Sequence, residues 1–572
     1  MEPELPFWGT ITDENDEKHN QAEQDYLISE GFSILKNFGN HVSFVMMSLG
    51  NELWGSQYRM NKILSAYKEF DNRHLYTQGS NNFQFTPVIL ENDDFFCGVR
   101  LSKERLLRGS YAMCDVPLGH VQTDMPSTMK DYDENISGNS NEFTTNIPII
   151  SHEIGQYETY PSFNEITKYT GPLKARNFEV FKKRLEEKGL SDLAEKYFKC
   201  SGRLAVACYK EELEATFRTR KLAGFQLLDL QDFSGQGTAL VGVLDAFMDS
   251  KELVSKEEWS NFCSDVVLMA RFDKYNYNAE ECFNTHVELC YYKNTPLTNL
   301  MLLWELKDND TIYEKGTVQV SKVNKENYIE ICDISLKMPA VTSMKKLTLS
   351  LEIKEINAEK NYDLWVYPKE IAVDIERSKM EGINIVDSLS QGTIELLEKG
   401  QNVLLCPNLS VLESSEIENS IKGVYCVDFW CYPMFRFISQ SANKEIPVGT
   451  MGLLIDNLHP IFKCFPCAEY STYQWWSIIT NSRSIILDDL PSNFRPIVST
   501  IDNFERNHKM GFLFECNVLN GKLLVCACDF EKTIEYAEGK QFIYSILNYF
   551  SSKEFSPNID ISISKLQKIL GS

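Results

Sequence analysis

The 572-residue sequence lacks any apolar run close to the roughly 18 residues that a membrane-spanning helix needs. Its first residues, MEPELPFWGT, contain neither the basic nor the apolar stretch of a secretory signal. Low-complexity segments are missing too, and a hydrophobic share of 43% excludes a mainly disordered chain. We therefore expect a folded protein without a membrane partner. It would be cytoplasmic as the chain stands, and periplasmic or secreted if an upstream signal is missing.

Basic residues are fewer than acidic residues. Lysine and arginine number 57 against 81 aspartate and glutamate, which gives a net charge of −24 spread along the chain. Because such a surface repels phosphate backbones, we expect no nucleic-acid partner, whereas neutral carbohydrate would not be repelled.

The sixteen cysteines form no compact disulfide framework. Several, such as Cys97 and Cys526, lie in apolar runs, where a free thiol behaves as a small buried hydrophobe. The single C-x-x-C, from Cys464 to Cys467, has no second cysteine or histidine pair nearby. We therefore expect reduced thiols, no metal site and no cofactor.

The first 250 residues alternate strand-like and helix-like segments. The runs HVSFVMMSLGNE, DFFCGVR, NIPIISHE and AGFQLLDLQDF are nearly continuously apolar, as is typical of strands covered on both faces. Stretches such as QYRMNKILSAYKEF have a helical pattern and lie between them. This alternation predicts a parallel sheet, either open and doubly wound or closed into a barrel.

Two further regions follow, so that we expect domains at 1–250, 261–368 and 369–572. In the second region the pattern changes to a period of two, and KLTLSLEI places its leucines on one face. This predicts a β-sandwich of about 100 residues. The third region mixes strands with helices and predicts a smaller α/β domain. The charged stretch DSKELVSKEEW at 249–259 is the expected first boundary.

Two acidic residues stand out by position. Glu52 follows the apolar run VSFVMMSLG, and Glu153 follows IPIIS, so each is expected at the C-terminal end of a buried parallel strand. Barrels and open α/β sheets place their chemistry there. Two carboxylates in one cleft suit glycoside hydrolysis, where one protonates the leaving oxygen and the other attacks the anomeric carbon or activates water. The alternative is that each glutamate caps a helix or forms a salt bridge.

The segments around these glutamates, SLGNELWG and SHEIGQY, resemble the acid/base and nucleophile segments of glycoside hydrolase family 2. That family contains β-galactosidases, β-glucuronidases and β-mannosidases. The resemblance implies that Glu52 is the general acid/base, that Glu153 is the nucleophile, and that Asn51 bonds the 2-hydroxyl of the substrate. Only four residues precede Leu5 in ELPFWG, which resembles the loop after barrel strand three, so the chain resembles an N-terminally truncated member.

For the fold, the resemblance implies an α/β chain that begins with part of a (β/α)8 TIM barrel, from strand three or four to strand eight. An immunoglobulin-like β-sandwich would follow, and then a small α/β domain similar to glutamine amidotransferases. True amidotransferases carry their cysteine in a Gly-x-Cys-x-Gly elbow, and Cys406 in LLCPNL lacks these glycines, so we expect no amidotransfer. Trp475 and Trp476, with His459, suggest either a carbohydrate contact or a packing surface.

Further candidates for substrate binding lie at strand ends and in loops. Trp8 and Trp54 offer ring faces for a sugar, His120 lies in a long loop that could reach the cleft, and Tyr157 could orient Glu153. Ordinary packing is the alternative for each. The remaining strand-end candidates are Asn81, Asn82, Arg100, Gln231 and Asp232.

The sequence thus predicts a retaining exo-β-glycosidase that hydrolyses terminal non-reducing β-linked sugars of oligo- or polysaccharides. A β-galactoside is the first choice of substrate and a β-glucuronide the second. A structural or oligomer-forming role is the default for the C-terminal α/β domain, which makes a homo-oligomer through the C-terminal domains possible. The alternative function is a non-catalytic carbohydrate-binding or scaffold protein derived from such an enzyme.

Overall fold

The computed structural model describes residues 1–109, 114–115, 120–121, 124–139, 141–233, 235–295, 297–309, 311–320, 327–371, 373, 382–414, 419–425, 427–444 and 448–570. The chain is a mixed α/β protein, as predicted. It divides into two compact units. The first comprises Met1–Ser110, Lys130–Gly155 and Glu212–Asp229, and the second comprises Tyr111–Met129, Gln156–Glu211 and Leu230–Ser572. The domain boundaries expected from the sequence stay a prediction.

Parallel strands form the centre of the first unit. Strand β2 pairs with β4, and β5 pairs with β8, which pairs with β9. Backbone hydrogen bonds from Asp94 N to Tyr76 O (2.8 Å) and from Asn81 N to Cys97 O (2.9 Å) place β4 beside β5 in the same direction. The C-terminal ends of five consecutive strands therefore meet at one edge. The strands of this unit are β1 (Trp8–Ile11), β2 (Met46–Ser48), β3 (Asn51–Gly55), β4 (Leu75–Thr77), β5 (Phe96–Gly98), β8 (Ile149–Gly155) and β9 (Gly224–Leu228).

Capped helices cover these strands. The Asn20 side chain accepts from Glu23 N (3.2 Å) before α1, and Ser56 accepts from Arg59 N (3.0 Å) before α2, which satisfies backbone donors at both helix starts. The apolar faces of both helices join one core with β2 and β3. The helices of this unit are α1 (Gln21–Phe38), α2 (Gln57–Phe70), α3 (Asp133–Ser137) and the last turns of α5 (Ala194–Arg218).

The strands of the first unit do not close into a barrel. Within the described residues, β2 and β9 are not paired with each other. A cavity of about 730 Å³ is lined by Met46 of β2, Gln226 of β9, His152 of β8, and by Glu2 and Glu4. Of the partial barrel expected from the sequence, the structure thus contains consecutive parallel strands and helices without closure.

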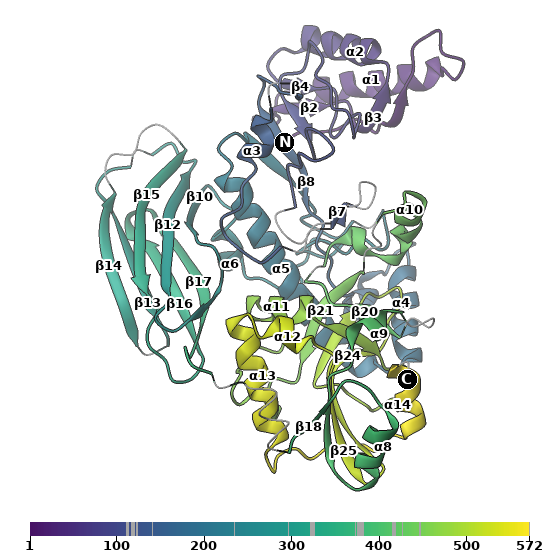
Figure 1. Ribbon diagram of the computed structural model, residues 1–572. Helices are drawn as coiled ribbons and strands as arrows, with labels where there is room; N and C mark the ends of the chain where they lie inside the picture. Colours follow the sequence, from purple (N-terminus) through teal and green to yellow (C-terminus); the bar gives the residue numbers. More distant parts are fainter. Residues whose placement is uncertain are drawn as a thin grey trace. The chain divides into compact units, whose positions relative to one another are not determined.

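The second unit contains two sheets that face each other (Figure 1). One has the order β10–β12–β15 and the other β11–β17–β16–β13–β14. Leu347, Leu349 and Leu351 of β16 are fully buried, which confirms the face predicted for KLTLSLEI. The sandwich strands are β10 (Val266–Arg271), β11 (Asn276–Asn278), β12 (Cys282–Tyr291), β13 (Leu300–Lys307), β14 (Ile312–Val320), β15 (Tyr328–Lys337), β16 (Lys345–Ile353) and β17 (Ala358–Tyr367). Its immunoglobulin-like character stays a prediction.

A mixed sheet with the order β18–β19–β25–β24–β22–β20 follows, and β23 pairs with both β21 and β24. Trp475 is fully buried in its core and packs against Phe465 (5.4 Å between ring centroids) and Phe542 (5.6 Å), which favours packing over a carbohydrate contact for this residue. The strands are β18 (Asn384–Val386), β19 (Asn402–Leu405), β20 (Ser420–Lys422), β21 (Thr450–Ile455), β22 (Arg483–Ile486), β23 (Val498–Asp502), β24 (Met510–Val518) and β25 (Gly521–Cys526). The helices are α8 (Gln391–Glu398), α9 (Leu409–Ser414), α10 (Arg436–Ser441), α11 (Trp476–Thr480), α12 (Phe530–Thr533), α13 (Ala537–Phe550) and α14 (Ile563–Leu570).

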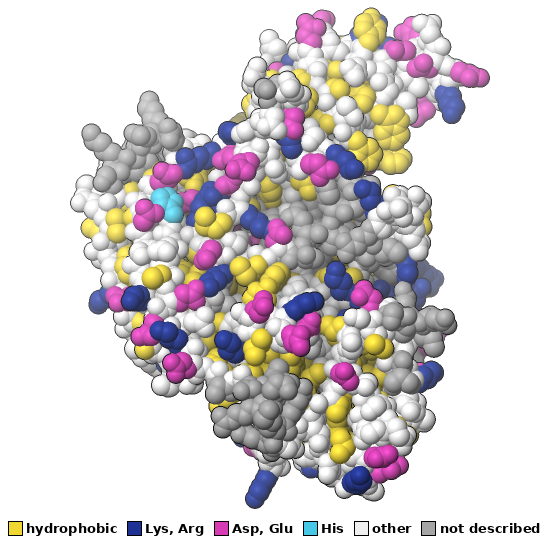
Figure 2. Space-filling view, in the orientation of Figure 1, with side chains coloured by type: hydrophobic (Ala, Val, Ile, Leu, Met, Phe, Trp, Pro, Cys, Tyr) yellow, Lys and Arg dark blue, Asp and Glu magenta, His cyan; other side chains and the backbone are white. Residues whose placement is uncertain are grey.

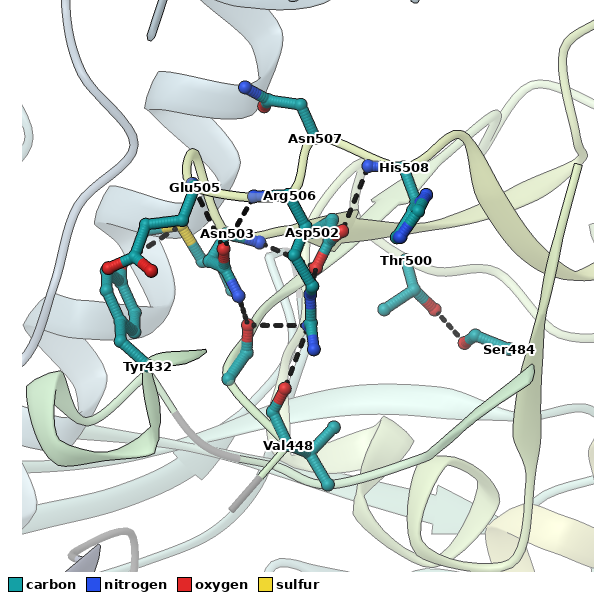
Figure 3. A network of polar contacts seen from close by, with 12 residues as sticks. Tyr432, Val448, Ser484, Thr500, Asp502, Asn503, Glu505, Arg506, Asn507 and His508 are labelled. Atoms are coloured by element: carbon teal, nitrogen blue, oxygen red, sulfur yellow. Dashed lines mark hydrogen bonds and ion pairs between the residues drawn. The ribbon is translucent and has the colours of Figure 1, made fainter. Parts of the chain in front are cut away.

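A buried carboxylate holds the turn after β23 (Figure 3). Asp502 accepts from Arg506 Nη2 (2.6 Å) and Nε (3.0 Å) and from His508 N (2.9 Å). The neighbouring Asn503 donates from Nδ2 to Gly449 O (2.7 Å). The network therefore ties the turn between β23 and β24 to the segment before β21.

The second unit also contains two short strands and three further helices. They are β6 (Cys114–Asp115), β7 (His120–Val121), α4 (Arg176–Glu187), α6 (Lys256–Ser260) and most of α5. Acidic and basic side chains are interspersed over the face of this unit seen in Figure 2. Within the described ranges, each helix is too short or too polar to cross a membrane.

Candidate active site

Glu52 and Glu153 occupy equivalent backbone positions in the first unit. Glu52 is the second residue of β3, the strand that follows β2, and Glu153 is the fifth of the seven residues of strand β8. Their φ values are 54° and 52°, in the left-handed region. This conformation costs a non-glycine residue on the order of 1–3 kcal/mol and clusters at functional sites. Both glutamates singled out by the sequence are thus among the thirteen non-glycine residues with positive φ in the described part of the chain.

Two side chains contact the Glu52 carboxylate. Trp8 donates from Nε1 to Oε2 (3.2 Å), and Asn81 donates from Nδ2 to Oε1 (3.4 Å). The Trp8 ring is 71% exposed and lies edge-on to Trp54, which is 41% exposed, with 6.1 Å between their centroids. Trp8 therefore holds Glu52 in place while most of its ring remains open to solvent.

The Glu153 carboxylate lies between two basic side chains. Arg108 Nη1 is 3.4 Å from Oε2 and donates to the backbone oxygen of Glu153 at 2.8 Å, and His152 Nε2 is 3.5 Å from Oε1. Burial by itself would raise the pKa of Glu153, but His152 and Arg108 lower it to about 2. Glu153 is therefore an ionised carboxylate at any physiological pH.

A direct contact joins the two glutamate segments. Asn51, which precedes Glu52, places Oδ1 at 3.1 Å from Nε2 of His152, which precedes Glu153. These residues are 101 positions apart in the sequence. Asn51, Glu52, His152 and Glu153 consequently belong to one cluster of side chains in the first unit.

Of the neighbouring candidates, Asn81 rather than Asn82 reaches Glu52. The Asn82 side chain accepts from Leu53 N (2.7 Å) and donates to Gln78 O (2.9 Å), so it braces the ends of β3 and β4. A substrate contact of Asn82 stays a prediction, as do those of Asn51, Trp8 and Trp54.

The roles of the other predicted site residues stay predictions. Tyr157 belongs to the second unit, where it is fully buried and packs edge-on against Tyr209 at 5.1 Å. Asp232 also belongs to that unit and pairs with Lys251 at 2.6 Å. His120 is in β7, and its side chain lies outside the described residues. The guanidinium carbon of Arg100 lies 5.8 Å from the centroid of the Phe85 ring. Gln231 forms an isolated parallel β-bridge with Leu244.

Sequence reasoning missed three residues of the cluster. Arg108 lies in a segment without a recognisable pattern. Gln226 lies in the predicted strand AGFQLLDLQDF, but only the fold brings its side chain to His152. His152 stands next to Glu153 in SHEIGQY, so a signal was present: a polar ring inside an otherwise apolar strand, beside a predicted nucleophile.

The cluster offers carboxylates, amides and fixed cations. Throughout the described part of the chain, no group of three or more histidine, cysteine, aspartate or glutamate side chains could hold a metal ion. The residues in place are suited to proton transfer and to nucleophilic attack by a carboxylate.

Two family models match parts of the chain. Residues 384–571 match a domain of unknown function (DUF8487), and residues 281–368 match another (DUF8488). A comparison with curated proteins finds no match.

Several solved structures match over part of their length. Bacteroides uniformis β-glucuronidase 3 is 12% identical, with 65% of this chain and 42% of that protein covered and a TM-score of 0.29. Parabacteroides merdae β-glucuronidase is 10% identical, with 65% and 41% covered and a TM-score of 0.26. The CARDB domain of a Pyrococcus furiosus protein is 12% identical over 18% of this chain and 94% of that domain, with a TM-score of 0.14. This chain spans less than half the length of the β-glucuronidases, and at these TM-scores the likeness does not bear on its activity.

Proposed function

We propose that this chain is a retaining glycoside hydrolase that removes terminal β-linked sugars, with Glu153 as nucleophile and Glu52 as general acid/base. The observation that carries the proposal is the pair of strained, strand-end glutamates in one side-chain cluster, one of them held ionised by Arg108 and His152. The expected substrate is a β-galactoside, and a β-glucuronide is the second choice.

In the first step, an oxygen of Glu153 attacks the anomeric carbon as the bond to the leaving oxygen breaks. Glu52 transfers its proton to that oxygen, and a covalent glycosyl-enzyme forms. The charge of Glu153 is required here, because a protonated carboxyl group is a poor nucleophile. Arg108 and His152 supply that charge state.

In the second step, Glu52, now ionised, takes a proton from water. The resulting hydroxide attacks the anomeric carbon, and the bond to Glu153 breaks. Trp8 and Asn81 donate hydrogen bonds to the Glu52 carboxylate and hold it in position for this step. Asn51 is placed to bond the 2-hydroxyl of the sugar, an interaction that strengthens in the transition state.

The second candidate function is carbohydrate binding without turnover. It is favoured by one observation: within the described residues β2 and β9 are not paired with each other, and a cavity is lined by residues of both strands. Because the sheet is not closed between these two strands, the site is less firmly supported there.

A panel of p-nitrophenyl β-glycosides tests both candidates. If the chain is a hydrolase, it should release nitrophenol from at least one β-glycoside, and the Glu153→Gln variant should lose that activity. The matched control is Glu134→Gln, an exposed glutamate on α3 of the same unit, which should leave the rate unchanged. Binding of a β-glycoside without turnover in the unaltered protein would favour the second candidate.

A further inference from the structure

The ring of His152 is enclosed by polar groups from four segments of the first unit. It is 7% exposed, with Nε2 at 3.1 Å from Asn51 Oδ1 and Nδ1 at 2.6 Å from Gln226 Oε1. Oε1 of Glu153 is 3.5 Å from Nε2. Each ring nitrogen therefore faces at least one oxygen.

The Gln226 amide lies between His152, Glu2 and Cys97, with its oxygen toward His152. Its Nε2 donates to Glu2 Oε2 at 2.6 Å, and its Oε1 accepts from the Cys97 thiol at 3.0 Å. The carbonyl oxygen of Gln226 thus faces His152. Since a carbonyl cannot donate, Nδ1 of His152 must carry a hydrogen.

The other ring nitrogen carries a hydrogen as well. Nε2 faces the carboxylate of Glu153, which accepts in its ionised form, and the side-chain oxygen of Asn51. A histidine that donates from both nitrogens is an imidazolium. The contacts of the ring therefore define its charge.

We propose that His152 is a positioning residue of the hydrolytic site, a buried imidazolium that keeps Glu153 ionised and aligns the amide of Asn51 with the sugar. The proposal rests on the proposed function of Glu153. With its oxygen bound to His152, Asn51 directs its NH₂ group away from the ring, in the sense needed to donate to a hydroxyl. The His152 side chain thereby contacts both glutamate segments and orients a group in each.

The electrostatic surroundings agree with this assignment. Burial would lower the pKa of His152, but the Cys97 thiol and the Glu153 carboxylate raise it well above its usual value. Glu2, which reaches the ring through Gln226, has its pKa raised to about 7 by burial and by Glu4. Arg108 contacts Glu153 from another segment and supplies a second positive charge.

Kinetics of His152→Gln provide the first test, on the p-nitrophenyl glycoside that the unaltered protein cleaves. We expect kcat to fall about 10- to 100-fold, as for the loss of other outer hydrogen-bonding partners, with a smaller change in KM. The acidic limb of kcat/KM should move upward from near pH 2 toward the ordinary glutamate pKa of 4.5. A purely structural histidine would not move this limb. The matched control is His74→Gln, a buried histidine of the same unit that stacks on Phe44 at 4.5 Å.

A second test is independent of turnover. In full-length protein with labelled histidines, the signal missing from His152→Gln identifies this ring. We expect both of its nitrogens to be protonated at pH 7, and Glu153→Gln to shift its titration to lower pH. A neutral ring at pH 7, or an acidic limb unchanged in His152→Gln, overturns the proposal. If the ring is charged but Glu153→Gln keeps full activity, the proposed function fails, and with it the positioning role, while the charge stands.

Discussion

Glu52 and Glu153 share one backbone conformation, with φ values of 54° and 52°, although they belong to strands far apart in the sequence. Glu52 is the second residue of β3, and Glu153 lies in β8 at the register shift between Ser151 and Ile154 in the pairing with β9. Strain of this kind persists only where the surrounding structure enforces it. The contact between Asn51 and His152 is part of that enforcement.

Azide separates the roles of the two glutamates. In Glu52→Ala, an activated aryl glycoside should still form the glycosyl-enzyme, which then accumulates because its base is missing. Azide needs no base, so it should accelerate this variant and give the β-glycosyl azide. In Glu153→Ala, azide can attack only directly and should give the α-azide. Product analysis by NMR checks this, and the opposite stereochemistry in the two variants would show that the roles are exchanged.

Trp8 should contribute to the rate through its hydrogen bond and to binding through its ring. Trp8→Phe keeps a ring but removes the donor to Glu52, and we expect kcat to fall about tenfold with little change in KM. Trp8→Ala should also raise KM. Trp54→Phe is the control, because no hydrogen bond from its ring to Glu52 is present. Equal kinetics for Trp8→Phe and the unaltered enzyme would assign the contact to packing alone.

Glu538 should make the stability of the chain depend on pH. Burial raises its pKa from 4.5 to about 7, and Ser477 donates to its Oε1 at 2.5 Å. The folded state therefore holds a proton that the unfolded state has lost between about pH 4.5 and 7, so stability falls as the pH rises through this window.

Glu538→Gln removes this dependence. We expect the free energy of unfolding to rise by about 2 to 3 kcal/mol at pH 8 and to change little at pH 4.5, measured by urea unfolding. Glu535→Gln, at an exposed position on the turn before α13, serves as control. A similar gain at both pH values would mean that Glu538 is not the titrating group.

Asp502 should be a strong contributor to the stability of the second unit (Figure 3). Its side chain is 1% exposed and pairs with Arg506, so Asp502→Asn should cost about 3 kcal/mol by leaving the guanidinium without its carboxylate. Thermal and urea unfolding measure the loss. Asp489→Asn breaks a pair with Lys568 at a half-exposed position and should cost less than about 1 kcal/mol. Equal losses of stability in the two variants would contradict a larger contribution from the buried Asp502–Arg506 pair.

Cys406 should be dispensable for catalysis. It follows β19 without a glycine on either side, and its backbone N–H donates to Val386 O at 2.8 Å. Cys406→Ala should retain full glycosidase activity, and no ammonia should be released from glutamine by either protein. Cys464→Ala, another half-buried cysteine, is the control. Ammonia release that disappears only in Cys406→Ala would reveal an amidotransferase centre.

Local patterns in the sequence predicted the elements well. The continuous apolar runs before Glu52 and Glu153 became β2 and β8, and the alternating leucines of β16 became one buried face. Each of these outcomes depends on hydrophobic residues a few positions apart, which decide locally which face of a strand avoids water. The strand-end location of both glutamates follows from the same signal.

Position along a strand end did not predict which side chain points where. Asn81 and Asn82 were equivalent candidates, yet Asn81 contacts Glu52 and Asn82 bonds the backbone. Asn81 has a φ of 54°, and such a turn depends on the bond of its N–H to Cys97 O in the next strand. The contact expected between Tyr157 and Glu153 stays a prediction, because strand-end position alone does not say where this fully buried ring points.

The sequence by itself determined the strands, the helices and the two glutamates, because these follow from the burial of apolar residues close together in the chain. Only the tertiary structure determined which side chains contact those glutamates and their neighbours: Arg108 and His152 lie beside Glu153, and Asn51 contacts His152. Contacts across about a hundred residues depend on strand order and register, which no local pattern encodes. The charge of Glu153 is therefore a property of the fold and not of its motif.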